Sequence, residues 1–571
     1  MRFRRSRRPV SRNEAGGSER TGLTVAIASV ALFLVGAAWS LSSAVGSSPD
    51  DGFHLTSIWC SPTAPGDACD RVGPGPEPRT GLFLVPERIS DDALDCFRFV
   101  PDESAACADA TTRAGAAMVG TRGNDGAYPS GFYSVLGLLV MDSVGFSVVA
   151  MRLLAWCVCC AVIGASVFAA DRALRPALIT AVLVTSVPLM VFISASTNPS
   201  SWAVAGSTAF FFAALAGLRA PSRGTTFMAA GIAGTAALIA LISRPDGGLW
   251  LSIGAVAALS IHYRRAREFD GRGLALVTAA FAAGAFLVLF TSSSSIAQRG
   301  LNIEGLPSRP FFEVLFYNLS EVPTLWIGSL GTWALGWLDT PMPALVPTAM
   351  IGVYAGAVTI GIAQPDRRNV RSLLFLVTAA VAVPLYLHAS DGSVVPQGIQ
   401  ARYILPVLPM VVVAALVRSH DAAPIRFTRR QSITGCAAVA IAHSLALHAN
   451  IRRHVSGQDI DRFNLGDDVE WWWWSGAPSP MLVWCIGSVA GGVVIVLIGR
   501  VIRLQRAPRG AAAIDPTKPG LPIRPAVRLG ANAERPTERA YRGPPRGPGG
   551  ASFTTIARRS SARRAGTDRR L

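Results

Sequence analysis

Apolar residues occur along this chain in long runs that are separated by short polar segments. The first run, residues 22–45, exceeds the roughly 20 residues that a helix needs to cross about 30 Å of hydrocarbon. Similar runs recur to near the C-terminal end. They predict twelve crossings, near residues 22–45, 148–170, 176–194, 200–218, 225–243, 247–263, 273–293, 343–362, 371–388, 403–418, 432–450 and 480–502. The pattern therefore predicts an all-α, polytopic integral membrane protein.

The positions of the arginines predict how these crossings are oriented. Residues 1–20 contain seven arginines, and several turns between apolar runs are also rich in arginine. Cytoplasmic loops carry an excess of Arg and Lys, and an even number of crossings places all of these basic segments on one side. We therefore expect both termini to be cytoplasmic, together with the turns at residues 171–175, 219–223, 264–272, 367–371 and 418–430.

Two further apolar stretches are residues 131–141 and 322–338. If each crossed the membrane once, the basic segments would no longer all lie on the cytoplasmic side. We expect them to form re-entrant or interfacial helices on the outer face.

The composition and the charge agree with a protein of the cell membrane. The chain has 571 residues, of which 50% are hydrophobic and 16% charged, and its mean hydropathy is +0.39. A net charge of +17 can indicate nucleic-acid binding. Here, however, the arginines lie at the termini and between apolar runs, as the positive-inside rule predicts. The expected partner is therefore the lipid bilayer, and no nucleic acid is expected.

The chain divides into three parts by composition. Residues 1–21 form a basic cytoplasmic N-terminus, and residues 22–502 form the multi-pass membrane domain. Residues 503–571 are rich in Arg, Pro, Gly and Ala, a composition typical of a disordered tail, here cytoplasmic. The first apolar run could instead be a cleaved signal peptide, because small residues follow it. Its length and the motif directly behind it favour an uncleaved anchor.

The largest predicted outer segment, residues 46–130, contains four of the nine cysteines, namely Cys60, Cys69, Cys96 and Cys107. An even number of cysteines outside the membrane indicates disulfides. Three connectivities are open, and the local pairing of Cys60 with Cys69 and of Cys96 with Cys107 is the simplest. The alternative, a zinc site, lacks the CxxC spacing that such sites use.

Polar motifs gather at the predicted outer ends of the helices. The acidic pair Asp50 and Asp51, with His54 close behind, directly follows the first crossing. A proline next to a polar residue is a common helix boundary, so each motif alone has a plain structural interpretation. Their shared side favours one site. The other candidate residues for this site are Tyr128, Asn198, Arg244, Asp246, Asp339, Gln397, Gln400, Arg402 and Tyr403.

Carboxylates together with arginines at a membrane surface suit a substrate with an anionic head and an apolar tail, such as a polyprenyl-phosphate sugar. Transfer of the sugar to a cell-envelope glycan or protein needs a general base and cationic groups for the departing phosphate. Asp50 or Asp51 could be the base, and Arg402, with Arg244 nearby, could hold the phosphate. A divalent cation could also bind the acidic pair, but two carboxylates without further ligands support no firm cofactor.

Ordinary structural roles compete with these assignments. Asp50 and Asp51 could cap a helix, and His54 could make an interfacial hydrogen bond. Arg402 could reach toward lipid headgroups, although its outer location runs against the arginine bias. The remaining alternatives are a surface ion pair of Arg244 with Asp246 and a turn cap at Asp339.

The order of six motifs adds a resemblance to a known family. The segments SPDDGFH, YPSGFY, NPSS, SRPDG, GWLDTP and QGIQARYILPVLP occur in this order between residues 48 and 409. In this the chain resembles, over about residues 20–500, the bacterial membrane proteins of the domain of unknown function 2142 family. That family in turn resembles the GT-C glycosyltransferases, which use lipid-phosphate-linked sugars and place a catalytic acidic residue in their first outer loop.

The resemblance implies a GT-C-like fold and hexosyl transfer, with one carboxylate of the acidic pair as catalytic base. It also implies His54 as the companion of that base, and it assigns Gln400, Arg402 and Tyr403 to the later motif. This chain has Asp-Asp-Gly where the family commonly has an Asp-Glu-Pro-like stretch. Which of the two aspartates is the base is therefore left open.

Two other functions are compatible with the same residues. A transporter or flippase would bind a lipid-linked saccharide without reacting with it. Transporters tend to place charges and broken helices at the bilayer midplane and to contain inverted repeats, and neither sign is evident in the sequence. A non-catalytic assembly or sensory protein would use residues 46–130 as a binding domain.

Overall fold

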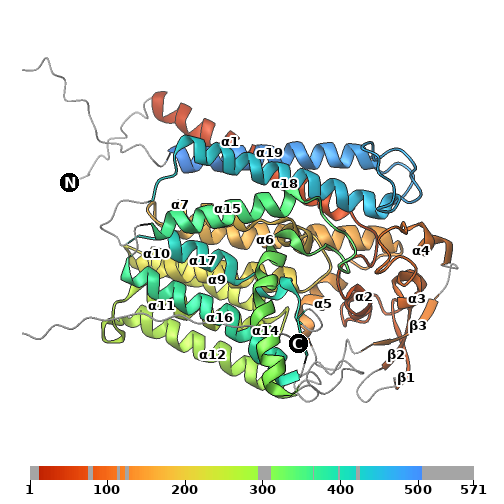
Figure 1. The fold of residues 1–571 in the computed structure, drawn as a ribbon, viewed down its shortest axis with the longest axis horizontal. Coiled ribbons are helices and arrows are strands. Elements are labelled where there is room, and N and C mark those ends of the chain that lie inside the picture. The colour runs from red at the N-terminus through yellow and green to blue at the C-terminus, as the bar shows by residue number, and fades with distance from the viewer. Residues whose placement is uncertain are drawn as a thin grey trace, which may run out of the picture. The chain divides into compact units, whose positions relative to one another are not determined.

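The computed structural model describes residues 12–74, 81–111, 116–121, 128–293, 310–363, 366–391, 393–395, 399–418 and 425–504. Most of these residues are helical, and the long helices lie side by side (Figure 1). Gln397 and almost all of the predicted tail, residues 503–571, lie outside the described residues.

Nine of the helices in the described part are long and apolar enough to cross a membrane. The chain is therefore a multi-pass membrane protein. These helices are α1 (Arg12–Leu41), α6 (Val144–Ala169), α9 (Ser200–Arg219), α10 (Arg223–Leu241), α12 (Gly271–Ser293), α15 (Leu345–Ile362), α16 (Arg367–Asp391), α18 (Arg429–Val455) and α19 (Pro480–Leu504).

The expected count of twelve crossings is not confirmed, because the structure supports nine, or ten with a bent pair. The predicted crossing at 176–194 is divided into α7 (Arg175–Thr185) and α8 (Pro188–Ser194), which meet at 90°. Pro188 lacks the N–H that would continue the hydrogen-bond ladder of α7, so the helix breaks there.

The other two predicted crossings are the short helices α11 (Gly247–His262) and α17 (Val407–Leu416). With 16 residues, α11 is about 24 Å long, less than the hydrocarbon thickness. All residues of α17 and most of α11 are buried in the protein. Their apolar character therefore reflects burial against other helices, which sequence pattern alone does not distinguish from contact with lipid.

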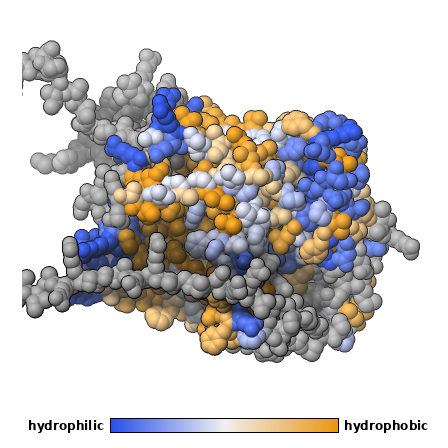
Figure 2. Space-filling view, viewed as in Figure 1, coloured by the Kyte–Doolittle hydropathy of each residue, from blue (hydrophilic) through white to orange (hydrophobic). Residues whose placement is uncertain are grey.

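Helix α9 lies at the centre of this packing. Of the residues in its span, 94% are buried inside the protein, whereas the other spans are 17 to 44% buried. It packs against α6, α10 and α11. The surrounding helices expose apolar side chains, and Figure 2 shows an apolar zone over the helices with polar surface toward both ends. This is the pattern of a bundle that faces lipid on its outside.

Residues 46–130, expected as one long loop, contain both helices and a small sheet. Three antiparallel strands pair in the order β1 (Asp70–Pro74), β2 (Gly81–Pro86) and β3 (Ala116–Thr121). Every second residue of β2 is buried, so one face of the strand packs inward. The helical elements here are α2 (Asp51–Trp59), the 3-10 turn η1 (Glu87–Ile89), α3 (Asp91–Leu94) and α4 (Ala106–Thr111).

Two disulfides tie this segment together. Cys60 is bonded to Cys69, and Cys96 is bonded to Cys107. The first bond holds the end of α2 to the chain just before β1, and the second joins the chain after α3 to α4.

The two stretches expected to form re-entrant or interfacial helices are partly helical. The first contains α5 (Ser130–Gly137), which has eight residues. The second covers the end of α14 (Phe311–Ile327) and the π turn η3 (Gly328–Thr332). Gly331 adopts a φ of 115° there, which only glycine enters readily. A last short turn, η4 (Ala401–Ile404), precedes α17.

Candidate functional site

Asp50 stands immediately before α2 in the left-handed region of backbone space, with a φ of 62°. Its carbonyl oxygen accepts hydrogen bonds from the backbone N–H groups of Phe53 (3.1 Å) and His54 (3.0 Å). Its carboxylate does not cap the helix and instead forms an ion pair with Arg402 of η4. The Asp50 side chain is 42% exposed, whereas that of Arg402 is 3% exposed. The carboxylate is thus held by an arginine and still accessible.

Asp51 occupies a different environment. It is completely buried, and its carboxylate accepts hydrogen bonds from the hydroxyl of Thr197 (2.7 Å) and the N–H of Ser48 (3.0 Å). Burial raises the pKa of Asp51 to about 6, against the opposing effects of Arg152 and of these two hydrogen bonds. The pair that looks equivalent in sequence therefore consists of one accessible carboxylate and one that fixes the start of α2.

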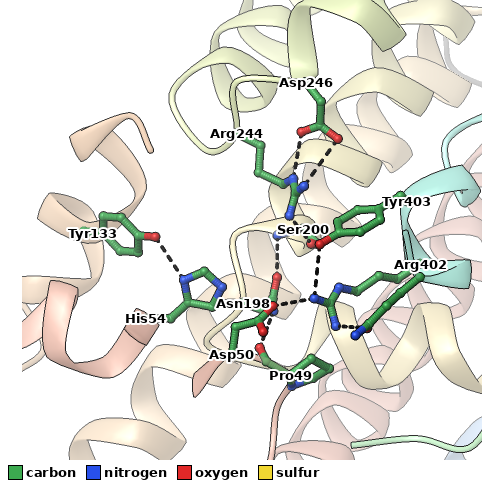
Figure 3. A network of polar contacts seen from close by, with 11 residues as sticks. Pro49, Asp50, His54, Tyr133, Asn198, Ser200, Arg244, Asp246, Arg402 and Tyr403 are labelled. Atoms are coloured by element: carbon green, nitrogen blue, oxygen red, sulfur yellow. Dashed lines mark hydrogen bonds and ion pairs between the residues drawn. The ribbon is translucent and has the colours of Figure 1, made fainter. Parts of the chain in front are cut away.

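The guanidinium of Arg402 is the centre of the polar cluster (Figure 3). It donates to the side-chain oxygen of Gln400, to the carboxylate of Asp50 and, at 3.4 Å, to the hydroxyl of Tyr403. Although 42% of its side chain is exposed, the many protein atoms around Asp50 would by themselves raise its pKa. The positive charge of Arg402, with Arg244 adding to it, outweighs burial and holds this pKa below its ordinary value.

A second guanidinium, that of Arg244, reaches the same place from the segment between α10 and α11. It donates to Asp246 at 2.7 and 3.4 Å and to the hydroxyl of Ser200 at 3.1 Å. The ring of Tyr403 lies close to both cations, 4.7 Å from Arg244 and 5.1 Å from Arg402. Two cations thus converge on one aromatic ring beside an accessible carboxylate, an arrangement that can bind an anion.

His54 borders the cluster on the side of α5. Its Nδ1 lies 2.9 Å from the hydroxyl of Tyr133, and its Nε2 has no hydrogen-bond partner in the described part of the chain. Burial lowers the pKa of His54 to about 3, although Asp50 acts in the opposite direction. The imidazole is therefore neutral at physiological pH. Tyr128 packs edge-on against it at 5.5 Å and lies 5.7 Å from Arg244.

Asn198, in the turn between α8 and α9, positions the chain that carries Asp50. Its amide nitrogen donates to the carbonyl of Pro49 at 2.7 Å, and its side-chain oxygen accepts from the N–H of Ser200 at 2.9 Å. Asn198 therefore links the backbone before Asp50 to the residue that meets Arg244.

Asp339 does not join this cluster. It is buried in a second network, where it accepts from Arg453 at 2.9 Å and from the backbone N–H of Trp337 at 3.2 Å. Arg453 also donates to the carbonyl of Phe97 at 2.6 Å. The network ties residues 46–130 to α18, so the geometry around Asp339 corresponds to a structural role. Its motif also combines a polar residue with a nearby proline, Pro341, which is why sequence alone grouped it with the others.

Two residues that were not predicted from the sequence, Thr197 and Arg152, stabilise the segment that carries the site. Thr197 binds Asp51, as described above. Arg152 of α6 is 1% exposed and donates to the carbonyls of Ser40 (3.0 Å), Ser43 (2.6 Å) and Ala44 (2.7 Å). It thereby holds the end of α1 and the turn that follows this helix. A charged residue inside an apolar run was the signal that could have found Arg152.

Among the described residues, no group of three or more His, Cys, Asp or Glu side chains is placed to hold a metal ion.

Fold and site together define a helical multi-pass membrane protein in which polar residues from distant parts of the chain converge where several helices end or begin. The sequence model of a family described as "Predicted membrane protein (DUF2142)" matches residues 33–411. This is more than half of the chain, which therefore belongs to that family. The match includes every residue of the cluster and leaves α18 and α19 beyond it. No curated protein and no solved structure shows significant similarity to the chain.

Proposed function

We propose that this protein is a GT-C-like glycosyltransferase that moves a sugar from a polyprenyl-phosphate donor to a cell-envelope acceptor on the outer face of the membrane. The observation that carries the proposal is the accessible carboxylate of Asp50 beside the guanidinium of Arg402, with Arg244 nearby. A base and a phosphate-binding pair are the two parts that such a transfer needs.

In this proposal Asp50 is the base. Asp51 is fully buried and both of its oxygens accept hydrogen bonds, which leaves it no accessible atom for a substrate. Asp50 takes the proton of the acceptor hydroxyl while the acceptor oxygen forms a bond to the anomeric carbon of the sugar. The bond from that carbon to the phosphate oxygen breaks, and polyprenyl phosphate leaves with the electron pair. The configuration at the anomeric carbon is inverted.

The ion pair between Asp50 and Arg402 couples donor binding to basicity. A donor phosphate that binds Arg402 partly neutralises the charge that lowers the pKa of Asp50. The carboxylate then becomes a stronger base once the donor is in place. Arg244, which Tyr403 connects to Arg402, supplies the second cation for the departing phosphate.

The imidazole of His54 is uncharged in this mechanism. His54 is fully buried, its Nε2 included, so its contact with Tyr133 holds the start of α2 against α5 and the ring does not reach the substrate. Because its pKa of about 3 leaves the imidazole deprotonated at neutral pH, His54 has no proton to donate, and we assign it a positioning role.

One observation favours a second candidate, a transporter or flippase of lipid-linked saccharide. The 90° break between α7 and α8 precedes the turn that carries Asn198, and broken helices bind substrates in many transporters. In that case Arg402 and Arg244 would recognise the cargo without any reaction.

The test uses purified protein in liposomes with a labelled polyprenyl-phosphate hexose and an acceptor extract. The wild type is expected to release polyprenyl phosphate, and Asp50→Asn to reduce the rate by about 10²–10⁴-fold. The matched control is Asp142→Asn, which changes an exposed aspartate outside the cluster. Movement of intact donor without release would support transport instead. If the protein neither releases polyprenyl phosphate nor moves the intact donor, the result supports the non-catalytic assembly role.

A further inference from the structure

A second feature of the molecule is a cavity of about 570 Å³ that the candidate site does not use. It lies between α7, α15 and α18, and none of its lining residues belongs to the polar cluster. The lining residues of α15 run from Thr348 to Ile360, which is about 18 Å along a helix with a rise of 1.5 Å per residue. The cavity is thus long, and its volume falls in the range of small-molecule sites.

Small residues keep this space open. A side chain added at Gly352 or Gly356 of α15, or at Gly435 of α18, would meet no atom within 4 Å. Glycines in membrane helices usually allow two helices to approach closely. Here they leave a gap instead, and the gap is walled by apolar side chains such as Leu183, Val353 and others of these helices. Thr348 and Gly352 are exposed, so the gap opens on the outside of the helix bundle, where a lipid can enter it.

One end of the cavity is polar and basic. Arg430 and Gln431 line it at the N-terminal end of α18, and Arg430 is exposed. The Gln431 side-chain oxygen accepts the N–H of Thr428 at 2.8 Å, so its amide N–H group remains as the donor. The beginning of a helix also carries partial positive charge. The cavity therefore joins an apolar channel to a cationic mouth.

We propose that this cavity binds one anionic phospholipid of the surrounding bilayer, with an acyl chain along α15 and the phosphate at Arg430. Two properties carry the assignment. The apolar walls match an acyl chain, and the charge of Arg430 matches a phosphate. The lipid would fill the gap between α7, α15 and α18 and would thereby hold these three helices together. This role is independent of the sugar transfer proposed above.

The binding test is lipid retention measured by native mass spectrometry, on protein exchanged into nanodiscs that contain phosphatidylglycerol and phosphatidylcholine in equal amounts. The wild type is expected to retain one phosphatidylglycerol. Gly352→Leu fills the cavity and should abolish retention. Gly231→Leu is the control, since Gly231 on α10 is equally unobstructed but does not line the cavity.

A second variant tests the charged mouth without changing the helix packing. Arg430→Gln should lower the preference for phosphatidylglycerol about tenfold, because one charge-assisted hydrogen bond to phosphate is lost. Arg429→Gln changes the neighbouring exposed arginine, which does not line the cavity, and should have little effect.

Equal retention of both lipids, or retention that Gly352→Leu leaves unchanged in a folded protein, would overturn the proposal. Polyprenyl phosphate added to the nanodiscs distinguishes the remaining occupant. If it displaces phosphatidylglycerol and Gly352→Leu blocks it, the cavity holds the isoprenoid chain of a donor and the phospholipid assignment is wrong.

Discussion

Arg402 sets the protonation of Asp50, and this makes the pair accessible to a pH experiment. The folded protein keeps the pKa of Asp50 below its ordinary value of 3.8 because the charge of Arg402 outweighs burial. Activity that needs the carboxylate is therefore complete above that pKa and is lost as the pH falls through it. The wild type should show an acidic limb of kcat/KM below about pH 4.

Arg402→Gln should shift this acidic limb to higher pH. Without the guanidinium, burial, which raises the pKa, is opposed by less positive charge. The measurement is kcat/KM against pH for the variant and for Arg223→Gln, which alters an exposed arginine away from the cluster. An unchanged acidic limb in Arg402→Gln would show that Asp50 is not the titrating base.

His54 should make the stability of the protein depend on pH. Its pKa falls from 6.5 to about 3 on folding, mainly because it is buried. Its neutral form is thus favoured by folding, so its contribution to stability is complete above pH 6.5 and decreases as the pH falls toward 3. His54→Gln should lose less stability than the wild type over this interval, measured as the thermal unfolding temperature in detergent.

The titration of Asp51 changes the stability of the protein in the opposite direction over part of the same pH interval. Its pKa rises from 3.8 to about 6, so its contribution is complete below pH 3.8 and is lost as the pH rises through 6. The two residues therefore partly compensate in the wild type. If lowering the pH from 6.5 toward 3 costs His54→Gln as much stability as it costs the wild type, the imidazole is not buried in its neutral form.

At the scale of elements, the junction between α1 and α6 depends on one arginine. Arg152 donates to the carbonyl of Ser40 in the last turn of α1 and to those of Ser43 and Ala44 in the turn that follows, and its removal takes this donor away from all three. Arg152→Met should therefore destabilise the protein by about 3 kcal/mol, the cost typical of breaking a buried charged network. Thermal unfolding in detergent measures the loss. Arg223→Met, at an exposed position, is the control and should leave the unfolding temperature unchanged.

The segment between α1 and α5 offers a chemical test of its disulfides. Cys60, Cys69, Cys96 and Cys107 should resist alkylation in denatured, non-reduced protein, whereas the other cysteines react. Reduction before alkylation should add four labels, read by mass spectrometry. Fewer than four additional labels would mean that at least one of these bonds is not formed.

At the scale of the whole molecule, the orientation in the membrane decides on which side the site lies. Position 142 precedes α6, and position 222 follows α9. The ion pair of Arg219 with Asp171 places the end of α9 beside the end of α6. Because α6 has 26 residues, about 39 Å of helix separates position 142 from that end.

Single cysteines at these two positions should therefore label from opposite sides. In a background without the other free cysteines, Asp142→Cys is expected to react with a membrane-impermeant maleimide in intact cells. Ser222→Cys should react only after permeabilisation. The reverse pattern would place the site on the cytoplasmic face and exclude an acceptor on the outside.

The positions of the apolar helices were predicted correctly from the sequence, but the number of membrane crossings was not. All twelve apolar runs are helical, but α11 and α17 are apolar because protein surrounds them, and Pro188 breaks a run that hydropathy treats as continuous. The sheet of residues 46–130 was not predicted, because its strands are short and only partly buried. Local pattern does not reveal which neighbours a helix acquires on folding.

The candidate site was predicted as a set of residues and not as a set of contacts. Asp50 and Arg402 are 352 positions apart, and only the packing of η4 beside the start of α2 brings them together. The same packing separates Asp50 from Asp51, whose side chains leave the backbone in different directions. Asp339 followed the same sequence rule and reached a different network, because its partner is on α18.

The left-handed backbone at Asp50 favours glycine for folding, whereas the proposed reaction requires a carboxylate at the same position. A non-glycine residue held in this conformation costs the native state on the order of 1 kcal/mol, and glycine would relieve that cost. Under the proposed mechanism, a family member with glycine at this position would keep the turn into its second helix and would have no catalytic base. Under the same mechanism, the residue at this position would separate catalytic from non-catalytic members of the family.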